Sequence, residues 1–140
     1  SSAVLAHDPF LVAMSSDHRL ADTSSSISLD RLAKENILLL EEGHCLRDQA
    51  ENLCIRSNIQ PSDIQATSLP TLVQMVAANM GITLLPRSAA PIEARKGSGV
   101  MTRPLRSSSA GRSIGLIWRT SSPIGTYLTS IISDLSTLWK

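Results

Sequence analysis

Short apolar runs alternate with amphipathic stretches along this chain, and turn residues separate one segment from the next. Apolar runs of about four to eight residues are typical of buried strands, whereas apolar residues three and four positions apart form one face of a helix. An alternation of the two kinds of segment indicates an α/β fold. The expected strands are 9–14, 37–40, 64–67, 82–86, 100–105 and 113–120.

The clearest helical pattern runs from Ser68 to Gly81. Its apolar residues recur at i, i+3, i+4, i+7 and i+8, which places them on one face. Ser68 is expected to cap the start of this helix and Gly81 to stop it. Helices are also expected after the caps Ser28 and Ser122 and from His44 onward.

The remaining stretches, 15–27, 89–99 and 106–112, are predicted to be loops because they are rich in polar and turn residues. Residues 1–8 hold little that would begin a sheet. The closing helix, by contrast, has a wide apolar face with no obvious partner earlier in the chain. We therefore expect the chain to be a fragment of a longer protein. The apolar face consists of Ile124, Tyr127, Leu128, Ile131, Ile132 and Leu135.

Length and charge limit the function classes. With 140 residues, the chain has the size of one domain with a real core. Its net charge of +1 provides no basic surface for phosphate contacts, so we do not expect this chain alone to bind DNA. No apolar run or signal-like start indicates a membrane or secreted protein. We expect a cytoplasmic location, where a disulfide is transient, catalytic or sensory rather than structural.

The only two cysteines, Cys45 and Cys54, are nine positions apart within a single predicted helix. On a continuous helix they would be separated by about 900° of rotation and about 13.5 Å along the axis. A disulfide needs Cα atoms roughly 4.4–6.8 Å apart. Helix and disulfide therefore exclude each other, so oxidation would unwind the segment, as a two-state switch requires.

The two thiols are expected to differ in environment. Leu46, Ala50, Leu53 and Cys54 fall at i, i+4, i+7 and i+8, which predicts a buried, protonated Cys54. Cys45 lies on the polar side at the helix start, where the helix dipole favours a thiolate. We expect Cys45 to be the thiol that peroxide oxidises and Cys54 to be the resolving thiol that condenses with its sulfenic acid.

Simpler interpretations stay open for each of these residues. Cys54 is also consistent with a small core residue, Cys45 with an ordinary exposed thiol, and His44 with a solvated turn histidine. A metal site built from His44, Cys45 and Cys54 with His7 or His18 would lack the CxxC or HxxxH spacing. We therefore expect neither a metal nor a cofactor.

Several segments carry a resemblance to a known family. GHCLRDQA (43–50) followed by Cys54 resembles the redox segment of the peroxide-sensing LysR-type transcriptional regulators. Residues 66–86 resemble the effector-domain signature of the wider LysR family, and 112–119 resemble its late strand. The octet with a second cysteine nine positions on is more specific than the signature, and it selects the peroxide-sensing members.

This resemblance implies a periplasmic-binding-protein-like LysR effector domain. Residues 1–8 would be a leader or hinge segment, 9–112 subdomain II, and 113–140 the return strand and helix of an incomplete subdomain I. The helix-turn-helix, the linker and the first pass through subdomain I have no counterpart here, so DNA would be bound only through the absent N-terminal domain. The full-length protein would be a homodimer or tetramer.

The resemblance also implies roles for individual residues. Cys45 would be the thiol attacked by hydrogen peroxide, and Cys54 its disulfide partner. His44 and Asp48 match polar residues around the peroxide pocket, and Arg112 matches an arginine near the reactive thiol. Hydroxyl residues that the family contributes from subdomain I are absent, so the pocket is expected to be open on one side.

Thr67 and Ser68 match positions that line the effector cleft of LysR-type domains. Three functions therefore stay open. The first is a redox sensor whose disulfide remodels the domain and alters transcription of oxidative-stress genes. The second is a thiol peroxidase, which the absence of a CxxC and of a thioredoxin-like pattern argues against, so we do not expect an enzyme. The third is a LysR-type domain for a small organic co-inducer, in which the cysteines are incidental.

Overall fold

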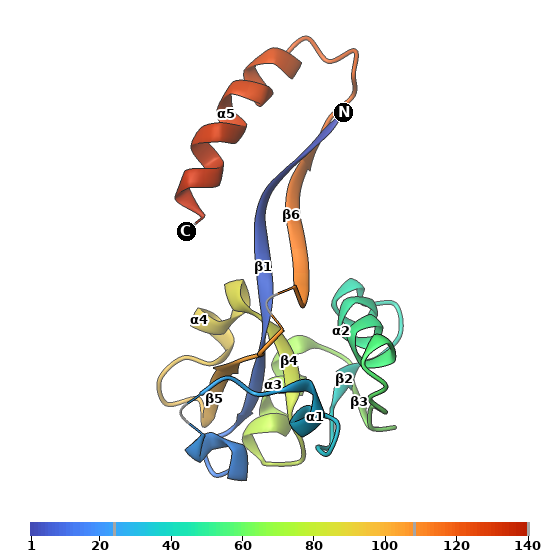
Figure 1. Ribbon diagram of the computed structural model, residues 1–140, viewed down its shortest axis with the longest axis vertical. Helices are drawn as coiled ribbons and strands as arrows, with labels where there is room; N and C mark the ends of the chain where they lie inside the picture. Colours follow the sequence, from blue (N-terminus) through green and yellow to red (C-terminus); the bar gives the residue numbers. More distant parts are fainter. Residues whose placement is uncertain (24, 108, 140) are drawn as a thin grey trace. The chain divides into compact units, whose positions relative to one another are not determined.

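The structure is a computed structural model that describes residues 1–23, 25–107 and 109–139. The chain divides into two compact units. The larger consists of Pro9–Gly111, and the smaller combines Ser1–Asp8 with the described residues from Arg112 onward. Strands and helices are mixed in the larger unit, which confirms the expected α/β class (Figure 1).

Strand β1 (Ser2–Ser15) is the central strand of the main sheet. It pairs antiparallel with β4 (Thr83–Pro86) on one side and with β5 (Val100–Pro104) on the other. Val12 and Met14 have no exposed surface, and all four residues of β4 are buried. The predicted strands at 9–14, 82–86 and 100–105 are thus confirmed.

The prediction that residues 1–8 do not begin a sheet is wrong, because β1 already starts at Ser2. Its partner there is β6 (Gly111–Ile117), which lies about a hundred residues later and gives no local signal. The two strands approach closely at Gly115, where an added Cβ would lie 2.6 Å from the Ala3 carbonyl oxygen. Only glycine fits there without a shift of the backbone.

A second, two-stranded sheet consists of β2 (Leu39–Leu40) and β3 (Gln65–Ala66), which run parallel. Both strands are shorter than predicted. A helix follows each of them, α2 (Cys45–Arg56) after β2 and α3 (Leu69–Ala77) after β3. Parallel strands point their carboxyl ends toward the same edge, so both helices begin at that edge of the sheet.

Two predicted helix caps are confirmed. Ser28 caps α1 (Leu29–Leu32), and the Ser68 hydroxyl accepts the Thr71 N–H at 3.3 Å at the start of α3. The predicted stop at Gly81 is wrong, since α3 ends at Ala77. Asn79, at φ 59°, already turns the chain in the left-handed region two residues before the glycine.

Gly81 has a packing role instead. A Cβ at this position would lie 2.5 Å from the Asn36 carbonyl oxygen. The absence of a side chain lets the chain pass next to residue 36, whose carbonyl accepts the Ile82 N–H at 2.9 Å. This contact sets the start of β4.

Other boundaries also differ from the predictions. The expected loop 89–99 contains α4 (Ala90–Glu93), preceded by a 3₁₀ helix at Arg87–Ala89, and the expected loop 15–27 contains another at Arg19–Asp22. These turns of three or four residues are too short to produce a periodic pattern. Within the predicted loop 106–112, Ser108 lies outside the described residues and the last two positions belong to β6.

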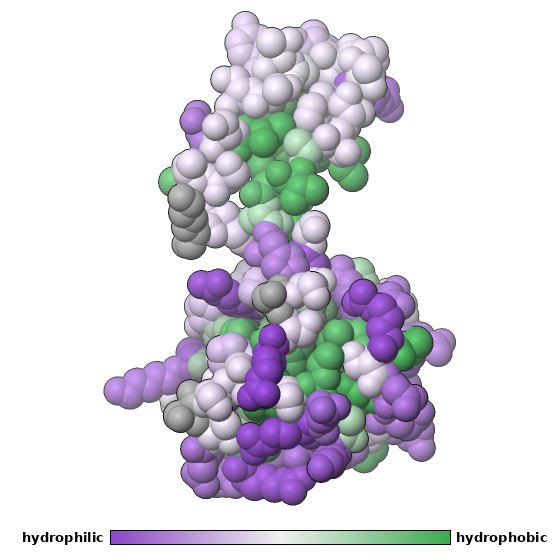
Figure 2. Space-filling model, in the orientation of Figure 1, coloured by the Kyte–Doolittle hydropathy of each residue, from purple (hydrophilic) through white to green (hydrophobic). Residues whose placement is uncertain are grey.

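The closing helix α5 (Gly125–Leu138) begins later than predicted, with Ile124 rather than Ser122 at the cap position. The Ser122 carbonyl accepts the Gly125 N–H at 3.0 Å, so the serine belongs to a turn before the helix. The apolar face of α5 is exposed in the smaller unit, and Figure 2 shows apolar side chains on the surface of this unit. The exposed large apolar residues of this segment are Ile124, Tyr127, Ile131, Leu135, Leu138 and Trp139. Among the described residues, no helix is long and apolar enough to cross a membrane.

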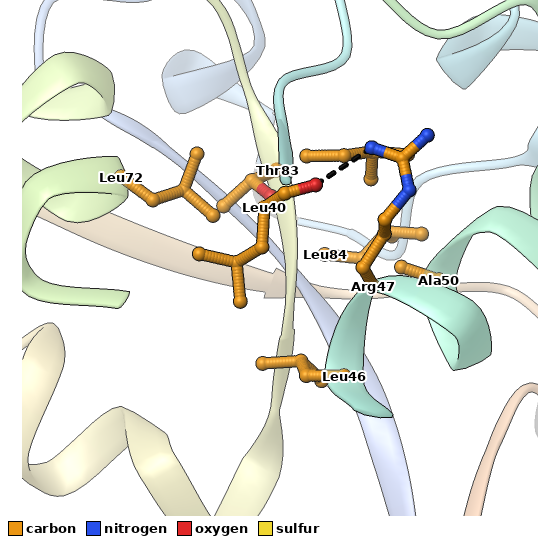
Figure 3. A pocket seen from close by; sticks show the side chains of 8 residues that line it. Leu40, Leu46, Arg47, Ala50, Leu72, Thr83 and Leu84 are labelled. Atoms are coloured by element: carbon orange, nitrogen blue, oxygen red, sulfur yellow. Dashed lines mark hydrogen bonds between the residues drawn. The ribbon is translucent and has the colours of Figure 1, made fainter. Parts of the chain in front are cut away.

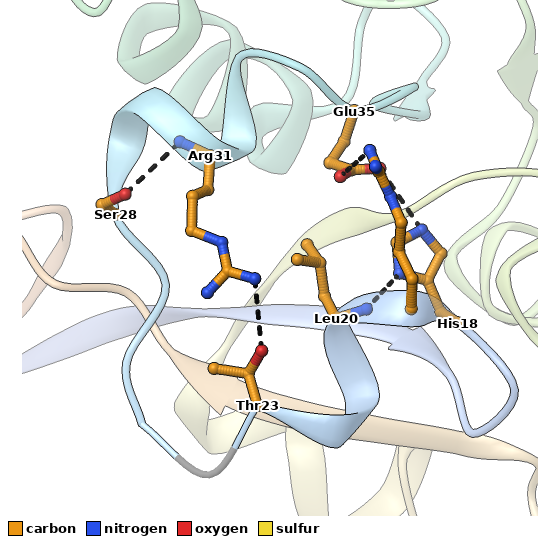
Figure 4. A network of polar contacts seen from close by, with 7 residues as sticks. His18, Leu20, Thr23, Ser28, Arg31 and Glu35 are labelled. Atoms are coloured by element: carbon orange, nitrogen blue, oxygen red, sulfur yellow. Dashed lines mark hydrogen bonds and ion pairs between the residues drawn. The ribbon is translucent and has the colours of Figure 1, made fainter.

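A buried carboxylate anchors the segment after β1 (Figure 4). The Glu35 side chain, only 7% exposed, pairs with Arg19 and lies 3.4 Å from His18 Nε2. His18 Nδ1 accepts the Leu20 N–H at 3.1 Å and thereby caps the 3₁₀ helix. Arg103 of β5 donates hydrogen bonds to the carbonyls of Ala21 and Thr23, and these two bonds fix the other end of the same helix.

The larger unit contains two apolar clusters. Helix α2 packs into one of them through Ala50, Leu53 and Cys54, and α3 packs into the other through Leu72, Val73 and Val76. Leu46, in the first turn of α2, contacts both clusters. The start of α2 is therefore held between the two parts of the core.

Candidate functional site

The carboxyl ends of β2 and β3 bring two helix starts to one edge of the sheet. Beyond β2, the Glu41 N–H donates to the Ala66 carbonyl at 3.0 Å, so the two segments are still paired where the strands end. The segment after β2 then turns at Gly43, whose φ of 95° favours glycine, and enters α2. The segment after β3 enters α3 through Thr67. In open α/β folds, ligands bind at such strand ends.

Cys45 is the first residue of α2, and its thiol is free and exposed. His44 occupies the N-cap position, but its side chain makes no capping hydrogen bond. The first N–H groups of a helix have no partner within the helix, and they carry the positive end of its dipole. Cys45 thus lies beside the unpaired N–H groups at the start of α2.

Cys54 lies nine residues further along the same helix and has no exposed surface. Burial, and to a smaller extent the negative charge of Glu51, raise the pKa of its thiol from 9.0 to about 11. The thiol is therefore protonated and shielded in this conformation. The predicted contrast between an exposed Cys45 and a buried Cys54 is confirmed.

The raised pKa of Cys54 predicts a pH dependence of stability. Since the folded chain holds this proton more tightly than the unfolded chain, the contribution is complete below pH 9 and is lost as the pH rises toward about 11. At about pH 10.5 the loss amounts to about 2 kcal/mol of the free energy of unfolding. Urea unfolding of the reduced protein at about pH 8 and about pH 10.5 measures it.

The control for this prediction is Cys54→Ala, which removes the buried thiol but leaves the other groups that titrate in the same range. Its free energy of unfolding should fall about 2 kcal/mol less between the two pH values than that of the unmodified chain. An equal fall in both proteins would contradict the assignment to Cys54.

The two thiols cannot bond while α2 is intact. Nine helical residues correspond to about 13.5 Å along the axis and to opposite sides of the helix. Because Cys45 and Cys54 both lie within α2, a disulfide between them requires the helix to unwind. The predicted location of both cysteines on one helix is thus confirmed.

The sequence interpretation missed Arg47. Its side chain is only 9% exposed, although arginine is usually a surface residue. Nη1 donates to the Leu40 carbonyl at 2.7 Å (Figure 3). Nη2 donates to Glu51 Oε1 at 2.9 Å. The i,i+4 spacing of Arg47 and Glu51 predicts an ion pair on a helix, but it does not predict that Arg47 is buried. The pocket around this guanidinium is lined by Leu39, Leu40, Leu46, Arg47, Ala50, Leu72, Thr83 and Leu84.

The other expected site residues lie in three places. His44 and Asp48 flank Cys45 at the start of α2, with Asp48 exposed. Ser68 and Thr67 lie at the start of α3, where the Ser68 hydroxyl is engaged as the cap. Arg112 belongs to the smaller unit and donates to Asp8 Oδ2 at 2.9 Å. Among the described residues, no group of three His, Cys, Asp or Glu side chains could hold a metal ion.

A comparison with protein families identifies this fold. The LysR substrate binding domain matches residues 1–134. The chain belongs to this family. Relatives of this LysR domain include the DNA-binding transcriptional dual regulator OxyR of Escherichia coli K12, which is 44% identical over 118 residues. The match covers 84% of this chain but 38% of that protein, so the LysR domain spans well under half the length of this relative.

Solved structures of OxyR resemble the LysR domain along almost its whole length. A cysteine-to-serine mutant of Corynebacterium glutamicum OxyR with hydrogen peroxide bound has a TM-score of 0.82 at 33% identity, covering 99% of this chain and 44% of that one. The reduced form of OxyR has a TM-score of 0.79 at 37% identity, covering 98% and 63%. The expected periplasmic-binding-protein-like LysR fold is confirmed.

Proposed function

We propose that this chain is the peroxide-sensing regulatory part of a transcription factor of the OxyR type. The observation that carries the proposal is the position of an exposed Cys45 and a buried Cys54 on one helix, where helix and disulfide exclude each other. The similarity to OxyR structures, one of them with hydrogen peroxide bound, supports the same conclusion.

The chemistry proceeds in two steps. The Cys45 thiolate attacks one oxygen of hydrogen peroxide, the O–O bond breaks, and hydroxide leaves as a sulfenic acid forms on Cys45. Hydroxide takes up a proton. The Cys54 sulfur then attacks the Cys45 sulfur, and water leaves as the disulfide forms. In sum, two thiols and one peroxide give one disulfide and two waters, so no further oxidant is needed.

Polar neighbours of Cys45 assist the first step in this proposal. His44, at the cap position, supplies a proton to the departing hydroxide, and Asp48 helps to position the peroxide. The resemblance described for the sequence assigns Arg112 the role of holding the thiolate and polarising the peroxide, whereas in this structure Arg112 pairs with Asp8.

The second step connects to transcription through the shape of α2. Cys54 must leave the core and the helix must unwind, so the surface at this edge of the sheet changes. In a homodimer or tetramer of the full-length protein, such a change alters the subunit contacts and hence how the attached DNA-binding domains engage a promoter.

The test is a count of free thiols on the reduced chain before and after about one equivalent of hydrogen peroxide, with intact mass and peptide mapping. We expect the loss of two thiols and about two mass units, with the peptides of Cys45 and Cys54 linked. Far-UV circular dichroism should show a loss of helix. Two thiols that stay reduced would reject the sensor.

A second experiment, which follows peroxide consumption in the presence of a reductant, separates the enzyme alternative. A thiol peroxidase would consume peroxide continuously when a reductant is supplied, whereas a sensor is oxidised once and is reduced slowly. A small organic co-inducer is the second candidate, because Thr67 and Ser68 lie at a strand edge of the kind that binds ligands. Ligand-dependent shifts of the melting temperature that survive Cys45→Ser would favour it.

A further inference from the structure

One guanidinium ties the start of α2 to the rest of the larger unit. Arg47 lies in the first turn of the helix, and its side chain passes into the pocket beside the end of β2 (Figure 3). There Nη1 donates to the carbonyl of Leu40, the last residue of β2, at 2.7 Å. Nη2 donates to the carboxylate of Glu51, one helical turn further along, at 2.9 Å.

Both contacts depend on the helical state of the segment. Arg47 and Glu51 lie between Cys45 and Cys54, inside the loop that a disulfide would close. Their side chains meet because residues four apart are neighbours on a helix. Bringing two residues that lie about 13.5 Å apart along the helix axis to within disulfide distance removes that helical geometry and pulls the first turn away from Leu40. The contacts of Arg47 therefore stabilise only the thiol form.

The same helix also carries an unfavourable burial. In the described part of the chain, the buried side-chain polar atoms without a hydrogen-bond partner are Arg47 Nε and Gln49 Oε1. Both belong to α2 and lie between the cysteines. A buried polar atom without a partner destabilises the state that buries it. The contacts of Arg47 with Leu40 and Glu51 therefore stabilise α2, whereas the two unpaired atoms destabilise it. Such a balance makes the stability of the helix sensitive to Arg47.

We propose that Arg47 is a positioning residue that sets how readily the Cys45–Cys54 disulfide forms, by holding α2 in the thiol form through Leu40 and Glu51. This inference rests on the proposed function and adds a control point to it. Arg47 acts on the second step, the condensation of the sulfenic acid with Cys54, and leaves the attack of Cys45 on peroxide unchanged.

The test compares the thiol–disulfide equilibrium of four proteins in dithiothreitol buffers of defined ratio. Arg47→Met removes both contacts at similar side-chain length, and we expect it to raise the equilibrium constant for the disulfide about tenfold, which is about 30 mV for a two-electron couple. Arg47→Lys keeps one cationic donor for Leu40, so a smaller rise is expected. Arg56→Met is the matched control, because Arg56 is exposed and lies beyond Cys54 on the same helix.

A second readout isolates the step. In a Cys54→Ser background, Arg47→Met should change the rate of sulfenic acid formation on Cys45 by less than about twofold. Equilibrium constants that match for Arg47→Met and Arg56→Met would overturn the inference, as would a change in the sulfenic acid rate as large as that in the equilibrium. Circular dichroism shows whether each variant folds. If Arg47→Met does not fold, the equilibrium constant of Arg47→Lys is compared with that of Arg56→Met instead.

The two levels of the proposal fail differently. If the unmodified chain forms no Cys45–Cys54 disulfide, the proposed function is rejected and the role of Arg47 with it. If the unmodified chain forms the disulfide but the Arg47 and Arg56 variants behave alike, only the positioning role is rejected.

Discussion

After treatment with about one equivalent of hydrogen peroxide, the Cys45→Ser variant is expected to keep Cys54 as a free thiol. Cys54 has no exposed surface, and burial raises its pKa to about 11. Only the thiolate reacts with peroxide, so near neutral pH such a thiol is slower than an ordinary one by more than about a hundredfold. Thiol counting with peptide mapping over time measures this loss of reactivity.

Cys54→Ser is the complementary variant. Cys45 remains exposed at the start of α2, so it should still be oxidised, but no second thiol is available to condense with its sulfenic acid. We expect oxygen to accumulate on Cys45, first as sulfenic and then as sulfinic acid, and no intramolecular disulfide. Oxidation of Cys54 in the Cys45→Ser variant at the rate of the unmodified chain would contradict the assigned order of the two thiols.

The second large effect is expected in the core. Ile37 has no exposed surface and belongs to the same apolar cluster as Cys54, with a backbone bridge to Ile82. Truncating a buried isoleucine to alanine removes apolar contacts and leaves a cavity, so Ile37→Ala should lower the free energy of unfolding by about 2–5 kcal/mol. Urea unfolding of the reduced chain, followed by circular dichroism, measures the difference.

Ile55→Ala is the matched control, because it makes the same chemical change on the outer side of α2. Ile55 is 68% exposed, so its truncation should change the free energy of unfolding by no more than about 0.5 kcal/mol. Similar losses in the two variants would mean that the apolar cluster around Ile37 does not provide the stability assigned to it.

Those parts of the fold that depend on local pattern were predictable from the sequence. The serine caps at Ser28 and Ser68 each require only a hydroxyl and an N–H three residues later, and both are present. The first half of β1 was not predictable, because its partner β6 is distant in sequence and Gly115 permits the close pairing. The start of α5 was misplaced because Ser122 and Pro123 form a turn before the helix.

For the site, the apolar stripe of α2 correctly placed Cys54 in the core and left Cys45 exposed. It gave no signal for the contact of Arg47, because a stripe does not reveal that the Leu40 carbonyl is available to a guanidinium. The parallel pairing of β2 and β3, which brings Cys45 and Ser68 to one edge, likewise depends on tertiary structure rather than on local sequence.

The complete burial of Cys54 has a kinetic consequence for the proposed sensor. A sulfenic acid on Cys45 must wait until α2 opens, and during this delay a second peroxide molecule competes with Cys54 for the same sulfur. At low peroxide, opening is faster and the reversible disulfide forms. At high peroxide, the second oxidation becomes faster than the opening of α2. A growing fraction of molecules then carries a sulfinic acid on Cys45, which thiols do not reduce. The opening rate of one helix therefore sets the upper end of the dose range over which the signal stays reversible.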